Sequence, residues 1–252
     1  MISRIFRSRT AKTAALPAVP PGQRLYAVGD VHGRLDLLEP LLARIEDDDA
    51  GRAPASTTLV FLGDLVDRGP QSAQVIDRLI ALKAQAPQTR FLMGNHEEVM
   101  LLSLDADREA LRLFARIGGR ETILSYGVDR ADYDAADYDG LFELMRAHVP
   151  EAHRAFLRAM EDMVIVGDYA FVHAGVRPDV PLAEQKTGDL RWIRGRFLDH
   201  GERLEKMIVH GHSIADDVQQ MPHRIGLDTG AFSTDRLSAM GFESTQRWVL
   251  QT

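Results

Sequence analysis

Acidic, amide and histidine side chains come directly after several apolar runs of this sequence, and their types and spacing could do chemistry. Five segments show the pattern: VGDVHG (28–33), LGDLVDRG (62–69), MGNHE (93–97), VHAG (172–175) and VHGHS (209–213). A single Gly-Asp pair is more often a turn or a helix N-cap than a ligand. Five such segments, with glycines that allow sharp turns and close approach of a substrate, indicate one shared site.

The donors in these segments are of the kinds that bind divalent metal ions. Carboxylate, amide and imidazole groups suit such ions, and the chain has no cysteine that could supply a thiolate ligand or nucleophile. Six donors are too many for one closed zinc site and suit two ions that share a carboxylate. Asp64 is the expected bridge because it lies between the other strand ends, and Asp30 and His32 are expected to bind the first ion. Two ions ~3.5–4 Å apart can activate a water molecule and bind a phosphoryl oxygen.

Alternating strands and helices are expected to carry these side chains to one edge of a sheet. Asp30, Asp64 and Asn95 follow successive strands roughly 30 residues apart, the length of one βαβ unit. Right-handed βαβ units give a mostly parallel sheet, with sites at the carboxyl ends of its strands. The expected strands are RLYAV (24–28), TTLVFLGD (57–64) and TRFLMGNHE (89–97), and the expected helices are 35–45, 72–84 and 97–104.

The rest of the chain divides into a tail, a helical insertion and a β-rich second half. Residues 1–23 are basic and rich in Pro and Ala, which predicts a flexible tail. Residues 105–160 are expected to form a helical cap over the site. Within it, Gly118 and Gly119 indicate either a plain helix break or a functional bend beside the site. Short strands are expected at MVIVGD, YAFVHAG, KMIVHGH, HRIGLDTG and RLSAMGF, with VGDY as a hairpin turn between the first two. We therefore expect a single catalytic domain over residues 24–252.

Composition excludes several classes of protein. The 252 residues are 45% hydrophobic and carry a formal net charge of −7, which argues against a general nucleic-acid or membrane-surface binder. No run reaches the ~20 apolar residues of a membrane span, and the tail lacks the apolar core of a signal peptide. The expected location is cytoplasmic, and the oligomeric state is left open.

Taken together, the motifs GDVHG, GDLVDRG, GNHE, HAG and GHS resemble the metallophosphoesterases of the phosphoprotein phosphatase superfamily, most closely the small bacterial and phage-type Ser/Thr protein phosphatases. The resemblance runs from about Leu25 to Leu250 and includes WIR (192–194), LDTGA (227–231) and IGGRETILSYG (117–127), the last similar to a substrate-side cap segment. It implies an α/β fold, a four-layer αββα sandwich with a helical cap. It also implies a phosphomonoester hydrolase that acts on phosphoproteins or phosphopeptides by direct attack of a hydroxide bridging two ions, with Mn²⁺ expected and Fe or Zn compatible.

The resemblance implies a role for each site residue. Asp30, His32 and Asp64 would bind the first ion, and Asp64, Asn95, His173 and His212 the second, with His210 as a neighbour of His212. His96 would be the general acid, oriented by Asp67, and Arg68 and Arg194 would bind phosphate oxygens. Arg191 and Arg196 flank Arg194 and could take its place. A seryl or threonyl alkoxide is a poor leaving group, so such an acid contributes roughly 10²–10⁴-fold.

Two other functions compete with this interpretation. A dinucleoside tetraphosphate hydrolase has the same fold and metals but cleaves an anhydride. That subgroup typically lacks the second Asp of GDLVDRG and has GNHD, so Asp67 and the GNHEE segment favour ester cleavage. A non-catalytic scaffold with this fold would have lost metal ligands, and no ligand is missing from this sequence.

Overall fold

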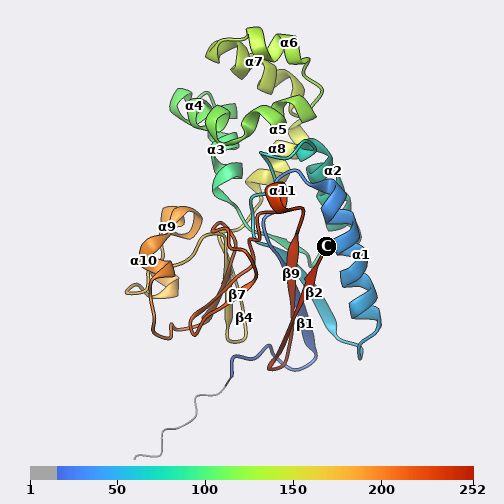
Figure 1. The fold of residues 1–252 in the computed structure, drawn as a ribbon, viewed down its shortest axis with the longest axis vertical. Coiled ribbons are helices and arrows are strands. Elements are labelled where there is room, and N and C mark those ends of the chain that lie inside the picture. The colour runs from blue at the N-terminus through green and yellow to red at the C-terminus, as the bar shows by residue number, and fades with distance from the viewer. Residues whose placement is uncertain (1–15) are drawn as a thin grey trace, which may run out of the picture.

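Two five-stranded β-sheets form the centre of the protein in this computed structural model, which describes residues 16–252 (Figure 1). The first sheet has the order β10-β9-β1-β2-β3, and the second has the order β4-β5-β6-β8-β7. Strands of the first sheet are β1 (Gln23–Val28), β2 (Ser56–Phe61), β3 (Arg90–Phe91), β9 (Ser238–Glu243) and β10 (Gln246–Gln251). Strands of the second are β4 (Met163–Val166), β5 (Tyr169–Val172), β6 (Met207–His210), β7 (Gln219–Gln220) and β8 (Arg224–Gly226).

The first sheet contains the predicted βαβ units but is mixed. Strand β1 pairs in parallel with β2, and β2 with β3, across the helices α1 (Leu35–Ala50) and α2 (Ser72–Gln85). Strands β9 and β10 add an antiparallel hairpin to the other edge of β1, so the expectation of a mostly parallel sheet was wrong for this half. The segment RLSAMGF forms β9 and returns directly into β10, and such a short hairpin connection allows only antiparallel pairing.

Two expected strands are shorter than the sequence pattern predicts. Strand β2 ends at Phe61, and β3 contains only Arg90 and Phe91. The chain turns at Gly63 and Gly94. The apolar residues between the end of each strand and its glycine are buried but lie outside the β-strands. Helix α3 (Asn95–Leu104) consequently begins two residues before the predicted Glu97 and carries Asn95 and His96 in its first turn.

The core lies between the two sheets and beneath the flanking helices. Alternate residues of a strand face opposite sides of a sheet, so Leu25 and Ala27 pack against the second sheet while Tyr26 and Val28 pack beneath α1 and α2. The second sheet is covered by η1 (Leu182–Glu184), α9 (Thr187–Trp192) and α10 (Gly195–Leu198), through Phe197 and Leu190. These layers confirm the expected αββα sandwich.

Five helices lie above the carboxyl ends of the parallel strands (Figure 1). They are α4 (Arg108–Ile117), α5 (Gly119–Ser125), α6 (Arg130–Ala135), α7 (Tyr138–His148) and α8 (Glu151–Arg158). Their apolar residues join those of α1–α3 in one cluster. The cap therefore shares a core with the first sheet and is held in place beside the site. A short helix α11 (Ala231–Thr234) lies between β8 and β9, below the cap.

The end of the predicted tail packs onto the sheets. Residues 1–15 lie outside the described residues. Val19 is buried and its N–H donates to the Ser244 carbonyl (2.8 Å), while the Tyr169 hydroxyl donates to the Pro17 carbonyl (3.1 Å). Residues 16–22 thus run along the lower edges of both sheets. Among the described residues, no helix has the length and apolar character needed to span a membrane.

Candidate active site

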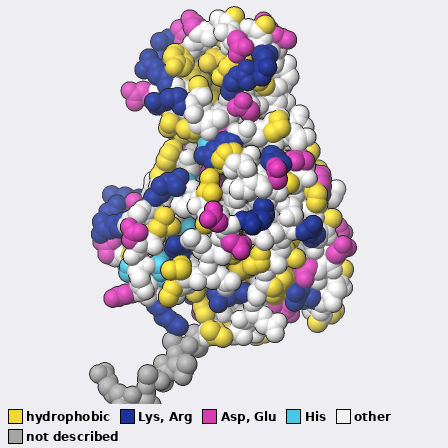
Figure 2. All heavy atoms as spheres, viewed as in Figure 1, with side chains coloured by type: hydrophobic (Ala, Val, Ile, Leu, Met, Phe, Trp, Pro, Cys, Tyr) yellow, Lys and Arg dark blue, Asp and Glu magenta, His cyan; other side chains and the backbone are white. Residues whose placement is uncertain are grey.

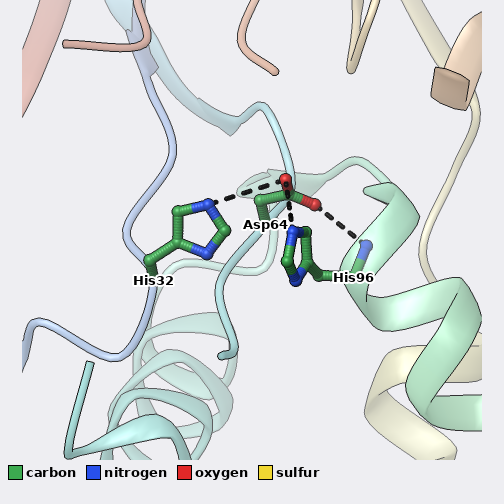
Figure 3. Close-up of side chains that lie close together, drawn as sticks. All are labelled: His32, Asp64 and His96. Atoms are coloured by element: carbon green, nitrogen blue, oxygen red, sulfur yellow. Dashed lines mark hydrogen bonds and ion pairs between the residues drawn. The ribbon is translucent and has the colours of Figure 1, made fainter. Parts of the chain in front are cut away.

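The predicted ligands meet at one end of the two sheets, around the carboxylate of Asp64. Figure 3 shows His32 and Asp64 there, beside His96. The Nε2 atoms of His32, His96 and His173 lie 3.7, 3.8 and 3.3 Å from the Asp64 carboxylate oxygens. His32 follows β1, Asp64 follows β2, and His173 follows β5, so both sheets supply the site. All the predicted metal ligands are buried: Asp30, His32, Asp64, Asn95, His173 and His212.

Backbone carbonyls set the orientation of two of these imidazoles. His32 Nδ1 lies 2.8 Å from the Val66 carbonyl, and His173 Nδ1 lies 2.8 Å from the Leu62 carbonyl. A carbonyl can only accept, so each Nδ1 carries the proton and each Nε2 keeps its lone pair. This is the arrangement by which proteins orient histidine ligands toward a metal.

Two further predicted ligands each have a buried polar atom without a hydrogen-bond partner. The buried atoms Asp30 Oδ1 and His212 Nε2 have no hydrogen-bond partner, whereas Asp30 Oδ2 accepts the His212 backbone N–H (2.9 Å). Buried polar atoms are normally paired. Asn95 Oδ1 lies 3.0 Å from His173 Nε2. The donor set therefore fits metal ions.

The donors form two groups that share Asp64. His32, Asp64 and His96 offer atoms within 4.8 Å of one another, and so do Asp64, His173 and His212. Asp64 belongs to both groups, whereas Asp30 belongs to neither, and the role of Asp64 as a bridge stays a prediction. His96 enters the first group by distance, but both of its ring nitrogens already have protein partners, which fits the role of an acid better than that of a ligand.

Burial and the neighbouring charges shift the pKa values of the predicted ligands, down for His32, His212 and Asp64 and up for Asp30 and His173. Burial lowers the pKa of His32 and of His212 to about 3, so both imidazoles are neutral at pH 7. Burial opposes ionisation of Asp64, but the neighbouring His173 and His96 outweigh it and hold its pKa well below the usual range. Burial, followed by the charges of Asp228 and Asp64, raises the pKa of Asp30. Divalent cations would offset this concentration of carboxylates.

His96 and Asp67 form a buried pair. His96 Nδ1 lies 2.6 Å from Asp67 Oδ2, and the other Asp67 oxygen accepts the Thr122 hydroxyl (2.7 Å). Burial alone would lower the pKa of His96, but the carboxylates of Asp64 and Asp67 outweigh it and raise that pKa. A raised pKa keeps more of the imidazole protonated near neutral pH, as a general acid requires.

Arg68 stands between the two histidines of the first group. Its guanidinium donates to His32 Nε2 (3.0 Å) and lies 3.1 Å from His96 Nε2, and its Cζ lies 4.7 Å from the centre of the Phe232 ring. His32 Nε2 has a single lone pair, so His32 could hold a metal ion only if Arg68 no longer donated to this atom. The released guanidinium has the planar fork that suits phosphate oxygens.

Arg194 differs from its two arginine neighbours in its partners. Arg191 is paired with Asp162 and Glu98, and Arg196 with Asp179. Arg194 lies beside Ser213, with 3.5 Å between Nη1 and the hydroxyl, and Ser213 follows the predicted ligand His212. Of the three arginines, Arg194 is therefore the one without a carboxylate partner among residues 16–252. His210 instead lies behind the site, against Phe197 and Arg224.

Backbone strain is concentrated at the site. His32, Asp64, Asp67, Arg68 and His212 have φ between +47° and +71°, a region that residues other than glycine rarely occupy. Such conformations cost free energy and persist where the surrounding structure imposes them. The strain directs these side chains into the cluster.

Glu97 holds the Asp64 loop, and the sequence analysis did not assign it a role. Its carboxylate accepts the backbone N–H groups of Asp64 (2.8 Å), Leu65 (2.7 Å), Val66 (3.1 Å) and Gly94 (3.0 Å). A carboxylate that satisfies four buried donors fixes the two strand ends relative to each other. The only hint of this role in the sequence was the position of Glu97 directly after Asn95 and His96 in the GNHE motif.

Four more residues support the site without having been predicted. Thr122 and Ser72 hold Asp67, since both hydroxyls accept its backbone N–H. Phe232 packs against His32 and Arg68. Asp228 is buried beside Asp30, with its Oδ2 unpaired. Three of the four lie in or next to the segments IGGRETILSYG and LDTGA, namely Thr122, Asp228 and Phe232. Their partners are distant in sequence, so these contacts could not be predicted from the segments alone.

Gly118 brings the cap into contact with Arg68. It has φ +119°, its carbonyl accepts the Arg68 N–H (3.1 Å), and an added Cβ would lie 2.7 Å from that nitrogen. Gly119 packs against the Phe114 ring, where a Cβ would lie 2.5 Å from a ring carbon. The glycine pair therefore forms a helix break that touches the site.

We expect Gly118→Ala to lower kcat/KM about tenfold for every phosphate substrate, because the added methyl group displaces Arg68 at a cost of ~1.4 kcal/mol. Steady-state kinetics measure this. Gly127→Ala is the matched control, since Gly127 also has a positive φ (+83°) but no atom within 4 Å of the added Cβ. Equal losses in the two variants would show that backbone strain alone, and not contact with Arg68, causes the effect.

Comparison with known proteins agrees with this geometry. The family model of the calcineurin-like phosphoesterases matches residues 23–223, which is most of the chain. The protein therefore belongs to the calcineurin-like phosphoesterase family, whose members are metal-dependent phosphoesterases.

Curated relatives are named as bis(5'-nucleosyl)-tetraphosphatases. The symmetrical enzyme of Acidovorax ebreus is 37% identical over 197 residues, covering 78% of this chain and 55% of the relative. The asymmetrical enzyme PrpE of Anoxybacillus flavithermus is 27% identical over 235 residues, covering 85% of this chain and 89% of the relative. The chain thus spans about half the length of the symmetrical relatives it matches.

Solved structures share the fold. A candidate diadenosine tetraphosphatase superimposes with a TM-score of 0.62 at 21% identity, covering 94% of this chain and 98% of the other. A Saccharomyces cerevisiae protein Ser/Thr phosphatase similar to human PP5 has a TM-score of 0.59 at 16% identity, covering 92% and 80%. These likenesses support the fold.

Proposed function

We propose that this phosphoesterase hydrolyses dinucleoside tetraphosphates, with Asp30, His32, Asp64, Asn95, His173 and His212 as ligands of two divalent ions, Mn²⁺ foremost. The sharing of Asp64 by two groups of buried donors is the observation that carries the phosphoesterase chemistry. The names of the curated relatives support this substrate class and reverse the preference for ester cleavage drawn from the sequence. Residues 24–252 form the catalytic domain of this proposal.

Each residue around the metal ligands has a defined task in this proposal. When bound, the ions supply an activated water and electrophilic stabilisation of the phosphoryl group. Arg68 and Arg194 bind its remaining oxygens and orient the phosphorus, because guanidinium forks match phosphate geometry. His96 gives its proton to the departing oxygen, and Asp67 holds the ring and stabilises its charge, as the 2.6 Å contact indicates.

A second candidate substrate is a phosphorylated serine or threonine in a protein or peptide. The observation that favours it is the His96–Asp67 pair, which Thr122 further orders. A departing alkoxide needs a proton much more than a departing nucleotide does. A general acid that is oriented by hydrogen bonds therefore contributes most in an enzyme that cleaves alkyl phosphoesters.

A substrate panel tests the proposal directly. The chelated protein, reloaded with Mn²⁺, Fe²⁺ or Zn²⁺, is assayed with diadenosine tetraphosphate, a panel of phosphoserine, phosphothreonine and phosphotyrosine peptides, and nitrophenyl phosphate. We expect the highest kcat/KM for diadenosine tetraphosphate, by at least about tenfold. Nucleotide products separate symmetrical cleavage to ADP from asymmetrical cleavage to AMP and ATP. A higher kcat/KM for a phosphopeptide would overturn the substrate proposal, and no turnover of any substrate would favour a non-catalytic scaffold.

A further inference from the structure

A groove of about 500 Å³ lies beside the active site, between helices α3 and α4 of the upper part and Trp192 at the end of α9. Its walls are largely apolar and include Val99, Leu102 and Leu113. In Figure 2 the outline of the molecule is indented between the cap and the body, and hydrophobic side chains border the indentation. The groove is large enough for a heterocyclic base with its sugar.

Trp192 is held in a fixed orientation while much of its ring stays accessible. The side chain is 40% exposed, and its Nε1–H donates to Glu98 Oε2 (2.5 Å). The other Glu98 oxygen accepts from Arg191 (2.8 Å), which is itself bound to Asp162. An exposed indole that is anchored by a buttressed carboxylate offers a preorganised surface on which an aromatic ring can stack.

The groove lies next to the proposed catalytic groups through both Glu98 and Trp192. Glu98 stands in the first turn of α3, directly after the segment that carries Asn95 and His96. Trp192 precedes Arg194 by two residues, and Arg194 lies beside Ser213, the neighbour of the ligand His212. A substrate whose phosphorus sits at the metal ligands and whose leaving oxygen faces His96 can therefore extend its leaving group along α3 past Glu98 to Trp192.

Two arginines on α4 supply positive charge along this path. Arg112 and Arg116 are exposed, one turn apart on the helix, and neither lies within 4 Å of a carboxylate in residues 16–252. Arg116 is close to the end of α4 where Gly118 contacts Arg68, whereas Asp107 and Glu109 stand at the opposite end. Of the two arginines, Arg116 is thus the nearer to the site.

We propose that this groove binds the departing nucleotide of a dinucleoside polyphosphate, with its base stacked on Trp192 and its phosphates beside Arg116 and Arg112. The inference rests on the proposed function and adds to it the residues that select a nucleotide as leaving group. Stacking on an aromatic side chain tolerates any base. The groove therefore selects for the presence of a base more than for its identity.

Kinetics of Trp192→Leu test the assignment. We expect this variant to raise KM for diadenosine tetraphosphate about tenfold, since stacking of one base accounts for a factor of this order. KM for nitrophenyl phosphate, which does not extend into the groove, should change less than about twofold. Trp192→Phe, which keeps an aromatic face, should recover most of the lost affinity. Equal changes for both substrates, or a change confined to phosphopeptides, would overturn the inference.

A binding experiment separates this inference from the proposed function. The chain has two tryptophans, so Trp248→Phe leaves Trp192 as the sole indole fluorophore. After chelation of metals, ADP should quench its fluorescence, whereas pyrophosphate, which lacks a base, should not. Quenching by ADP together with no hydrolysis of diadenosine tetraphosphate would reject the proposed function and keep the nucleotide site. Hydrolysis of that substrate with no effect of ADP on Trp192 would reject the groove and keep the proposed function.

Discussion

Asp64→Asn is expected to lose both metal ions and to lower kcat/KM by at least about 10³-fold, because bound ions contribute several kcal/mol to phosphoryl transfer. Asp64 is the only residue common to the two groups of donors. An amide has the shape of the carboxylate but no charge, and it is a poor bridge between two cations. Elemental analysis of the purified variant, beside the wild-type protein, measures the metal content.

Asp30→Asn is the matched comparison for this experiment. Asp30 is as buried as Asp64, but it belongs to the proposed ligands of the first ion alone. We therefore expect this variant to keep one ion tightly bound. Thermal unfolding of the chelated proteins checks that neither substitution has unfolded the chain. Two equivalents of tightly bound metal in Asp64→Asn would show that Asp64 is not the bridge.

His96→Asn is expected to have the second largest effect, and its size should depend on the leaving group. Turnover of an alkyl phosphoester, such as a phosphoserine peptide, should fall roughly 10²–10⁴-fold, as loss of a general acid predicts. Turnover of nitrophenyl phosphate should fall much less, because its aryl oxide departs readily without a proton. Diadenosine tetraphosphate should resemble nitrophenyl phosphate, since a nucleotide is also a good leaving group.

Two further variants test how His96 is held. Asp67→Asn should show the same order of substrates with smaller losses, because it removes only the group that orients the imidazole and stabilises its charge. Thr122→Val removes the hydroxyl that binds Asp67 and should have a weaker effect again. Metal content should stay at the wild-type value in all three variants. If His96→Asn slows every substrate equally while both metals remain, His96 acts on the nucleophile or the phosphoryl group.

The catalytic cluster could be anticipated from the sequence because its members follow strands. Asp30, Asp64 and Asn95 end successive βα units, and parallel pairing of β1, β2 and β3 brings such ends together whatever the details of the loops. His173 and His212 follow β5 and β6, which also pair in parallel. The local pattern of apolar run, glycine and ligand therefore carried most of the information about the candidate site.

The supporting contacts could not be anticipated, because they join segments that sequence spacing does not relate. Glu97 accepts four backbone N–H groups from two loops, and Thr122 of the cap binds Asp67, 55 positions earlier. Strand β9 was predicted at RLSAMGF, but β10 and its antiparallel pairing with β9 were missed because a short amphipathic strand carries a weak signal. The Trp192 groove depends on the position of the cap relative to α9, which is a property of tertiary packing alone.

Anomalous diffraction from crystals of the Mn²⁺-loaded protein tests most directly whether two ions share Asp64. We expect two peaks about 3.5–4 Å apart, one on either side of the Asp64 carboxylate. The first should contact Asp30 and His32, and the second should contact Asn95, His173 and His212. A single peak, or two peaks of which one does not adjoin Asp64, would contradict the proposed dinuclear centre and the phosphoesterase mechanism built on it.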